Sequence, residues 1–199
     1  MADLIDKTFF QKLAGENPRE VCKRALCSYD DFERCYTLDI WGDPFRICPD
    51  RCSVSRTREN HEPLHFYFDL FAVHYLLFAR EIDPENRWIS EKDIPGGATF
   101  FRGPHDIPTH LITERFNNDI PAFSEACRSY GGEPADLADA AFVFWITPRI
   151  PAAVLYWEGD DLFSPESKLL FDRTIADQLA LDVIYALAVG VCKRVGYGG

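Results

Sequence analysis

Apolar residues recur at helical spacing at the start of the chain. Ile5, Phe9 and Leu13 stand four positions apart, a period that predicts a short amphipathic helix. Asn17 and Pro18 predict the start of a second helix, with the asparagine as N-cap and the proline in the first helical position. The chain therefore begins with two short helices.

Strand-like runs follow the second helix. Residues 34–41, 45–48 and 51–54 are separated by turns that contain glycine or proline, and they predict a small antiparallel meander. Two later runs, 140–146 and 152–157, flank a connection bracketed by prolines. We expect these two runs to pair as a β-hairpin.

Two long apolar segments predict the main helices of the core. Residues 64–80 are the most apolar of all, so we expect a largely buried central helix there. Residues 175–195 predict a long closing helix. The stripe of the central helix that is expected to face water comprises His65, Asp69, Leu76 and Arg80.

Strands and helices come in clusters rather than in strict alternation, which favours an α+β fold over a parallel α/β fold. We predict an N-terminal helical extension over residues 1–15 and a single domain over residues 16–195. In this domain a small antiparallel sheet packs against the buried central helix and the long C-terminal helix.

Composition and charge narrow the class of protein. The 199 residues are 47% hydrophobic and carry a formal net charge of −11. An acidic chain repels phosphate backbones and anionic lipid surfaces, so we expect neither nucleic acid nor membrane as a partner.

The apolar run at 179–191 contains Asp182 and is too short for a bilayer, and the N-terminus resembles no secretory signal. We therefore expect a cytoplasmic protein.

The seven cysteines have irregular spacing, and without a signal peptide free thiols are expected. Cys22 and Cys27 are five apart on the predicted second helix, so their thiols would diverge by about 140°. Cys48 and Cys52 flank a turn and could converge. Buried thiols are the main alternative to a metal site at either pair.

His74 is the main candidate for a ligand-binding side chain. It lies within the apolar central helix, where a buried imidazole must satisfy two nitrogens. One hypothesis makes it a ligand to a metal or a tetrapyrrole, or a proton carrier in a pocket, and the other a core histidine bonded to neighbouring groups. The full set of cofactor-binding candidates is His74, Tyr67, Trp88, Gly96, Gly97 and Trp157.

Carboxylates are concentrated in the turn after the second hairpin strand. Glu158, Asp160 and Asp161 are candidate ligands for a divalent cation or an acid/base group. The alternative is a turn that caps a following helix, with Ser164 as N-cap and Pro165 at its first position. A second candidate metal set is His61, His65 and Asp69, with a surface hydrogen bond as the alternative for the last two.

Four segments together resemble a known family. They are NPREVCKRA at 17–25, HYLLFA at 74–79, WISEKDIPGG at 88–97 and PRIPAAVLYWEGDD…FSPESKLLFD at 148–172. The family is an uncharacterised domain of unknown function from anaerobic bacteria and archaea. Some members look like fusions to an iron–sulfur domain similar to that of corrinoid/iron–sulfur proteins, which implies a role near corrinoid or iron–sulfur metabolism.

Three functions are compatible with these observations. The first is a binding or accessory module that holds a small ligand, such as a corrinoid or haem-like tetrapyrrole, or a redox or iron–sulfur protein partner. The second is a divalent-metal-dependent hydrolase or lyase that uses the acidic turn at 158–172. The third is an acidic protein-interaction module.

Overall fold

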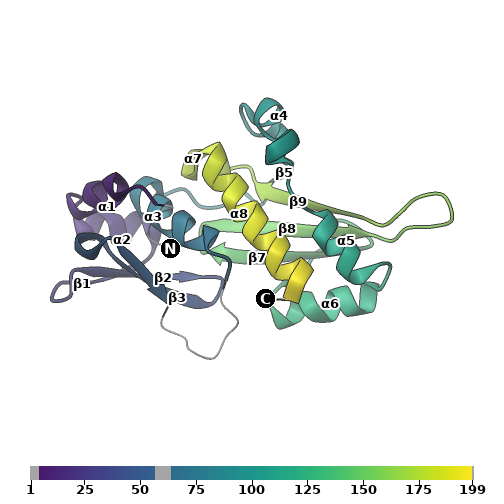
Figure 1. Cartoon of the computed structure of the whole chain (residues 1–199), viewed down its shortest axis with the longest axis horizontal. Helices are drawn as coiled ribbons and strands as arrows, with labels where there is room; N and C mark the ends of the chain where they lie inside the picture. Colours follow the sequence, from purple (N-terminus) through teal and green to yellow (C-terminus); the bar gives the residue numbers. More distant parts are fainter. Residues whose placement is uncertain (1–4, 57–63, 199) are drawn as a thin grey trace.

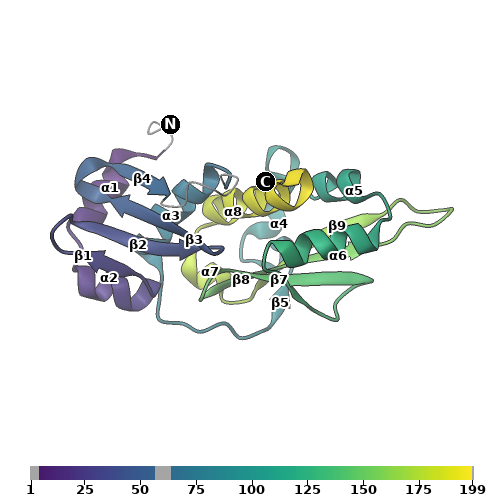
Figure 2. The ribbon, with the colours of Figure 1, turned by 90° about the horizontal axis from the view of Figure 1, so that it is seen from below.

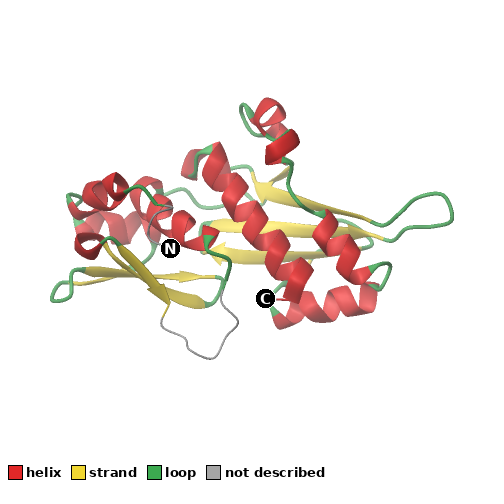
Figure 3. Ribbon diagram, in the orientation of Figure 1, coloured by secondary structure: helices red, strands yellow, loops and turns green. Residues whose placement is uncertain are grey.

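The computed structural model describes residues 5–56 and 64–198. Two antiparallel sheets lie side by side along the long axis of the molecule, with helices packed against both (Figures 1 and 3). This arrangement confirms the α+β class and corrects one detail, because the chain forms two sheets rather than one. None of the described helices combines the length and apolar character needed to cross a membrane.

The N-terminal sheet has four strands in the order β1-β2-β3-β4, which confirms the predicted meander. Apolar residues alternate along β2, so that one face is buried. Helices α1 and α2 precede the sheet, and the side chains of Asp6 and Asn17 cap their first turns. The bounds are α1 Lys7–Ala14, α2 Pro18–Ala25, β1 Ser28–Asp30, β2 Cys35–Ile40, β3 Asp43–Cys48, η2 Pro49–Arg51 and β4 Ser53–Arg56.

The central helix α3, Tyr67–Phe78, is buried along most of its length, as expected. The prediction of its water-facing stripe was wrong at Leu76, which is fully buried. The helix has neighbours on several sides, namely α1, α2, the N-terminal sheet and α8. The contact with α8 is so close that a Cβ at Gly190 would collide with the ring of Phe68.

The large sheet has five strands in the order β5-β9-β8-β7-β6, and β7 and β8 form the predicted hairpin. The helix expected from Pro165 onward was wrong, because Glu166–Asp172 is strand β9. Ser167, Leu169 and Phe171 alternate onto the face of the sheet that the helices cover. The other strands are β5 Trp88–Ile89, β6 Glu133–Pro134, β7 Ala140–Thr147 and β8 Ile150–Trp157.

Helices α5, α6 and α8 lie on one side of the large sheet (Figure 2). The predicted closing helix over 175–195 is divided into α7 and α8, because the backbone is extended at Leu179 and Ala180. Just before this break, the side chain of Gln178 bonds the backbone of Arg80 and Ile82. The bounds are η3 Glu91–Asp93, α4 Gly97–Phe100, η4 Gly103–His105, α5 His110–Phe116, α6 Ile120–Ser129, α7 Ile175–Gln178, α8 Leu181–Lys193 and η5 Arg194–Gly198.

Candidate functional site

A hollow of about 590 Å³ lies between the turn η3, helix α5 and the start of strand β9. Its floor is apolar, with contributions from Phe101, Ile107 and Leu169, whereas most of its rim is polar. We call it the α5–β9 hollow. Its lining residues are Ser90, Glu91, Lys92, Phe101, Asp106, Ile107, Thr109, His110, Thr113, Pro165, Glu166, Ser167, Lys168 and Leu169.

Local hydrogen bonds hold the walls of the hollow in place. The Ser90 hydroxyl donates to the carboxylate of Asp93 at 2.6 Å, and the same carboxylate accepts from the Ser90 backbone N–H. These two bonds hold the pKa of Asp93 below its ordinary value. On the opposite wall, the buried Ser167 hydroxyl donates to the carbonyl of Leu155 at 2.8 Å. The turn and the strand are therefore fixed before any ligand arrives.

Four charged or titratable side chains of the lining have no hydrogen bond or ion pair recorded within the described part of the chain. They are Glu91, which is half-buried, and Lys92, Asp106 and His110, which are exposed. Glu166 differs from them, because its carboxylate pairs with the ammonium of Lys168 at 3.0 Å. The hollow thus offers an ammonium, an imidazole and two carboxylates to an incoming molecule.

The predicted glycine turn stands beside the hollow rather than in it. Gly96 has φ +79°, a left-handed conformation that favours glycine, and it precedes α4. At Gly97 a Cβ would collide with the carbonyl of Glu91, a residue of the lining. Both glycines therefore shape the turn that carries Lys92.

His74 does not line the α5–β9 hollow. Its side chain is 8% exposed and its ring packs against Phe9 of α1, with centroids 4.2 Å apart. Burial lowers the pKa of His74, although the charge of Asp182 acts in the opposite direction. This ring is covered by an aromatic side chain, and its burial favours the neutral form.

The aromatic candidates are not brought to His74. Tyr67 begins α3 and stacks edge-on with the ring of His65. Trp88 and Trp157 pack against a small apolar cluster on the face of the large sheet that α5, α6 and α8 leave uncovered; the cluster is Ala141, Ala153 and Leu155. The structure thus separates the six predicted cofactor residues into three places: α3, the η3–α4 turn and the outer sheet face.

The acidic turn adopts a capped conformation without a helix. The carboxylate of Asp160 accepts from the N–H groups of Leu162 and Phe163 at 2.8 and 2.9 Å, which lowers its pKa. Glu158 and Asp161 are exposed. Across residues 5–56 and 64–198, no three His, Cys, Asp or Glu side chains are grouped so that they could hold one metal ion.

The second candidate metal set is dispersed. Asp69 pairs with Arg56 at 3.4 Å, and His65 lies 3.1 Å from the ammonium of Lys193. Burial, together with the charges of Lys193 and Arg56, lowers the pKa of His65 to about 4. His61 lies outside the described residues.

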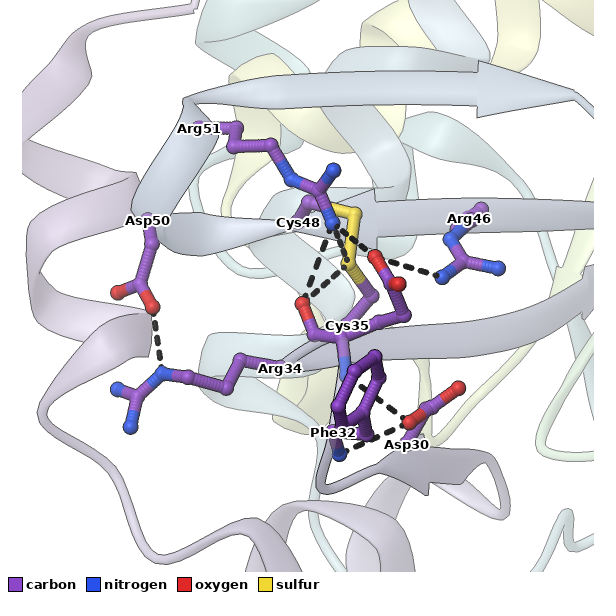
Figure 4. The surroundings of a disulfide bond; sticks show 9 residues. Asp30, Phe32, Arg34, Cys35, Arg46, Cys48, Asp50 and Arg51 are labelled. Atoms are coloured by element: carbon purple, nitrogen blue, oxygen red, sulfur yellow. Dashed lines mark hydrogen bonds and ion pairs between the residues drawn. A yellow bond between two sulfur atoms is a disulfide. The ribbon is translucent and has the colours of Figure 1, made fainter.

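Two expectations for the cysteines were wrong. Cys35 and Cys48 form a disulfide across strands β2 and β3, so these thiols are not free and Cys48 has no thiolate to share a metal ion with Cys52 (Figure 4). Arg51 lies over this bond, with a guanidinium nitrogen 3.3 Å from the Cys35 sulfur. Cys22 and Cys27 do not diverge, because their sulfurs are 3.8 Å apart.

Sequence reasoning missed Lys92 and His110, which line the hollow, and the Cys35–Cys48 bond. A signal for the bond was available: the turn at Trp41 and Gly42 sets a hairpin register in which Tyr36 faces Ile47. The cysteines are the next opposing pair. For the hollow no comparable signal exists, because η3, α5 and β9 are distant in sequence.

One family model matches the chain. It is described as a domain of unknown function, DUF3786, and it covers residues 17–194. No curated protein and no solved structure matches the chain. The family description mentions neither anaerobic organisms nor a fused iron–sulfur domain, so those two expectations remain predictions.

Proposed function

The chain thus belongs to the DUF3786 family, whose function is unknown, and from the geometry of the chain itself we propose a small-molecule binding module. The ligand would occupy the α5–β9 hollow. Its volume of about 590 Å³ suits a metabolite, since ligand pockets commonly measure about 300–1,000 Å³. The observation that carries the proposal is the set of unpaired lining groups, Glu91, Lys92, Asp106 and His110, beside the apolar side chains of the floor.

The rim chemistry favours a particular class of ligand. An acidic group would bind the Lys92 ammonium and the His110 imidazole, and an amino or hydroxyl group would donate to Asp106. The apolar floor around Leu169 would cover a short carbon skeleton. We therefore propose a small polar acid that also carries a hydrogen-bond donor, such as an amino acid or a sugar acid.

A tetrapyrrole fits these residues less well. Such a macrocycle needs a broad apolar slot and an accessible axial ligand. The rim of the hollow is polar, and the predicted ligand His74 is covered by Phe9. The imidazole that does line the hollow is His110. The corrinoid or haem hypothesis, and with it an accessory role in corrinoid/iron–sulfur metabolism, therefore stays a prediction supported by the family resemblance alone.

Thermal unfolding with added ligands tests the binding proposal. The panel comprises glutamate, malate, gluconate, haemin, cobinamide and an ultrafiltered small-molecule extract. A ligand at a hundred times its Kd stabilises the folded state by about 2.7 kcal/mol, so a fitting polar acid raises the Tm. Thr113→Trp fills the hollow and should remove the shift. Thr99→Trp, on exposed α4 outside the lining, should retain it.

Two results would reject the α5–β9 hollow as the ligand site. One is an unchanged Tm in every arm, the small-molecule extract included. The other is a Tm shift that persists in Thr113→Trp. A shift with haemin or cobinamide alone would favour the tetrapyrrole hypothesis, and comparison of His110→Ala with His74→Ala would then identify the ligating imidazole.

The β8–β9 loop supports a second candidate function, protein interaction. At its tip Leu162 and Phe163 are 83% and 72% exposed, and Asp160 holds their backbone in a fixed turn. The loop projects beyond the sheet (Figure 1). Carboxylates flank the two apolar side chains, so the complementary partner is a protein with an apolar pocket and a basic rim.

Site-specific crosslinking tests this second candidate. A photoreactive phenylalanine at position 163 should crosslink one partner, with a yield that falls as salt rises. Phe32 offers a matched control, because it is 91% exposed and also follows a capping aspartate, Asp30. Equal labelling from positions 32 and 163 would count against the loop as an interaction site.

The divalent-metal hydrolase or lyase hypothesis has the least geometric support. It requires Glu158, Asp160 and Asp161 to share one cation, yet one oxygen of Asp160 already accepts two backbone N–H groups. A thermal melt with magnesium, manganese or zinc tests it. A Tm rise that is lost in Asp160→Asn would revive the hypothesis.

A further inference from the structure

The sulfurs of Cys22 and Cys27 meet because of a left-handed residue. Helix α2 ends at Ala25, and Leu26 follows with φ 54° and ψ 48°. This conformation turns the chain back, so that the N–H of Cys27 donates to the carbonyl of Cys22 at 3.2 Å. The two sulfurs then lie 3.8 Å apart, whereas a continued helix would hold them on different sides.

The environment gives the two sulfurs different roles. Both cysteines are half-buried, and burial raises the pKa of both thiols. The Cys27 thiol donates a hydrogen bond to the Cys22 sulfur, which acts in the opposite direction at Cys22 and favours its thiolate. Cys22 is therefore the better nucleophile, and Cys27 is placed to attack it in turn.

The other free cysteines lack such a partner. Cys127 and Cys192 are fully buried, and Cys52 is half-buried like the pair. None of these three sulfurs contacts another free thiol within the described residues. The contact between Cys22 and Cys27 is thus a specific feature of the α2–β1 connection.

We propose that Cys22 and Cys27 form a redox-active dithiol that closes to a second disulfide, in addition to Cys35–Cys48. Closure requires the sulfurs to approach from 3.8 Å to about 2.05 Å, a side-chain rotation at the end of a helix. The site lies between α2 and β1, at the opposite end of the molecule from α5 and β9, and does not depend on ligand binding at those elements (Figure 1).

The oxidant is a low-molecular-weight disulfide. The Cys22 thiolate attacks one of its sulfurs, and the first thiol product leaves. The Cys27 thiolate then attacks the Cys22 sulfur of this mixed disulfide and releases the second thiol product. The protein loses two electrons and two protons, and one disulfide becomes two thiols, so the exchange balances.

Alkylation and peptide mapping of the full chain test the proposal, with oxidised glutathione in excess as the probe. In the unmodified sequence a 22–27 cross-link should form, because the two sulfurs are in contact, whereas Cys52 should stop at a glutathione adduct. The rate should rise from pH 7 to pH 9, since raised pKa values leave the thiols protonated at neutral pH. Cys22 and Cys27 that stay open to alkylation after Cys52 has reacted would overturn it.

Variants assign the two roles. Cys27→Ser should stop at a glutathione adduct on Cys22, and Cys22→Ser should leave Cys27 unmodified. Cys52→Ser is the control, because it removes a thiol that is half-buried like the pair. In this variant the 22–27 disulfide should form at the original rate. Equal slowing in all three variants would refute a specific dithiol. If a variant does not fold, the presence or absence of the 22–27 cross-link in the peptide map of the unmodified sequence still tests the proposal.

Discussion

The two sheets of this protein share one apolar core but differ in covalent support. The N-terminal sheet is cross-linked by Cys35–Cys48, and its edge carries exposed ion pairs such as Arg51 with Glu33. The large sheet buries one whole face beneath helices, and the thiols near it, Cys127 and Cys192, are free and buried. A smaller structure buries less apolar surface per residue, so a covalent link contributes relatively more to it.

The largest effect is expected from the core of the large sheet. Phe171 on β9 is fully buried, and Phe171→Ala should lower the free energy of unfolding by about 3–5 kcal/mol through lost burial and a cavity. Urea unfolding measures this. Trp145→Ala, on β7 but 40% exposed, is the control and should cost far less. Similar losses at both positions would contradict a core packed on one face only.

The next effect is expected from the N-terminal sheet. The disulfide closes a short loop, since its cysteines are 13 residues apart, and Cys35→Ala with Cys48→Ala should cost about 3 kcal/mol. Reducing agent should destabilise the unmodified sequence but leave the double variant unchanged. If the double variant and the unmodified sequence have the same Tm, apolar packing alone stabilises this sheet. The proposed difference between the two sheets would then be wrong.

A smaller, pH-dependent effect is expected at Asp172, at the end of β9. Burial raises its pKa, but bonds donated by Thr174, Glu85 and Arg87 outweigh burial and hold the pKa below its ordinary value. Asp172→Asn should therefore cost about 2 kcal/mol at pH 7, the range for hydrogen bonds to a charged group.

The sign of the pH dependence follows from the lowered pKa. The stabilisation by Asp172 is fully present above its unfolded pKa of about 3.9 and is lost as the pH falls through the lower folded value. Urea unfolding at pH 7 and pH 3 should show a narrower gap between Asp172→Asn and the unmodified sequence at pH 3. The exposed Asp177→Asn is the control and should show little change at either pH. A gap that widens at low pH would refute the assignment.

Local patterns predicted the local structure well. Asn17 and Pro18 start α2 as expected, and the proline-bracketed runs form the β7–β8 hairpin, because caps and turns depend on neighbouring residues. The same logic failed at Ser164 and Pro165, where a helix start was expected. Serine followed by proline is compatible with either a helix start or the residues before a strand. The segment that follows became a strand because it pairs with β8.

The sequence by itself determined the α+β class, the meander, the buried central helix and the acidic, capped turns. The tertiary structure decided which distant side chains lie in contact: Phe9 covers His74, and Cys35 bonds Cys48. It also placed Lys92, His110 and Leu169 around one hollow. Helix propensity and capping depend on residues a few positions apart. Contacts between side chains that are distant in sequence depend instead on strand register and helix packing across the whole chain.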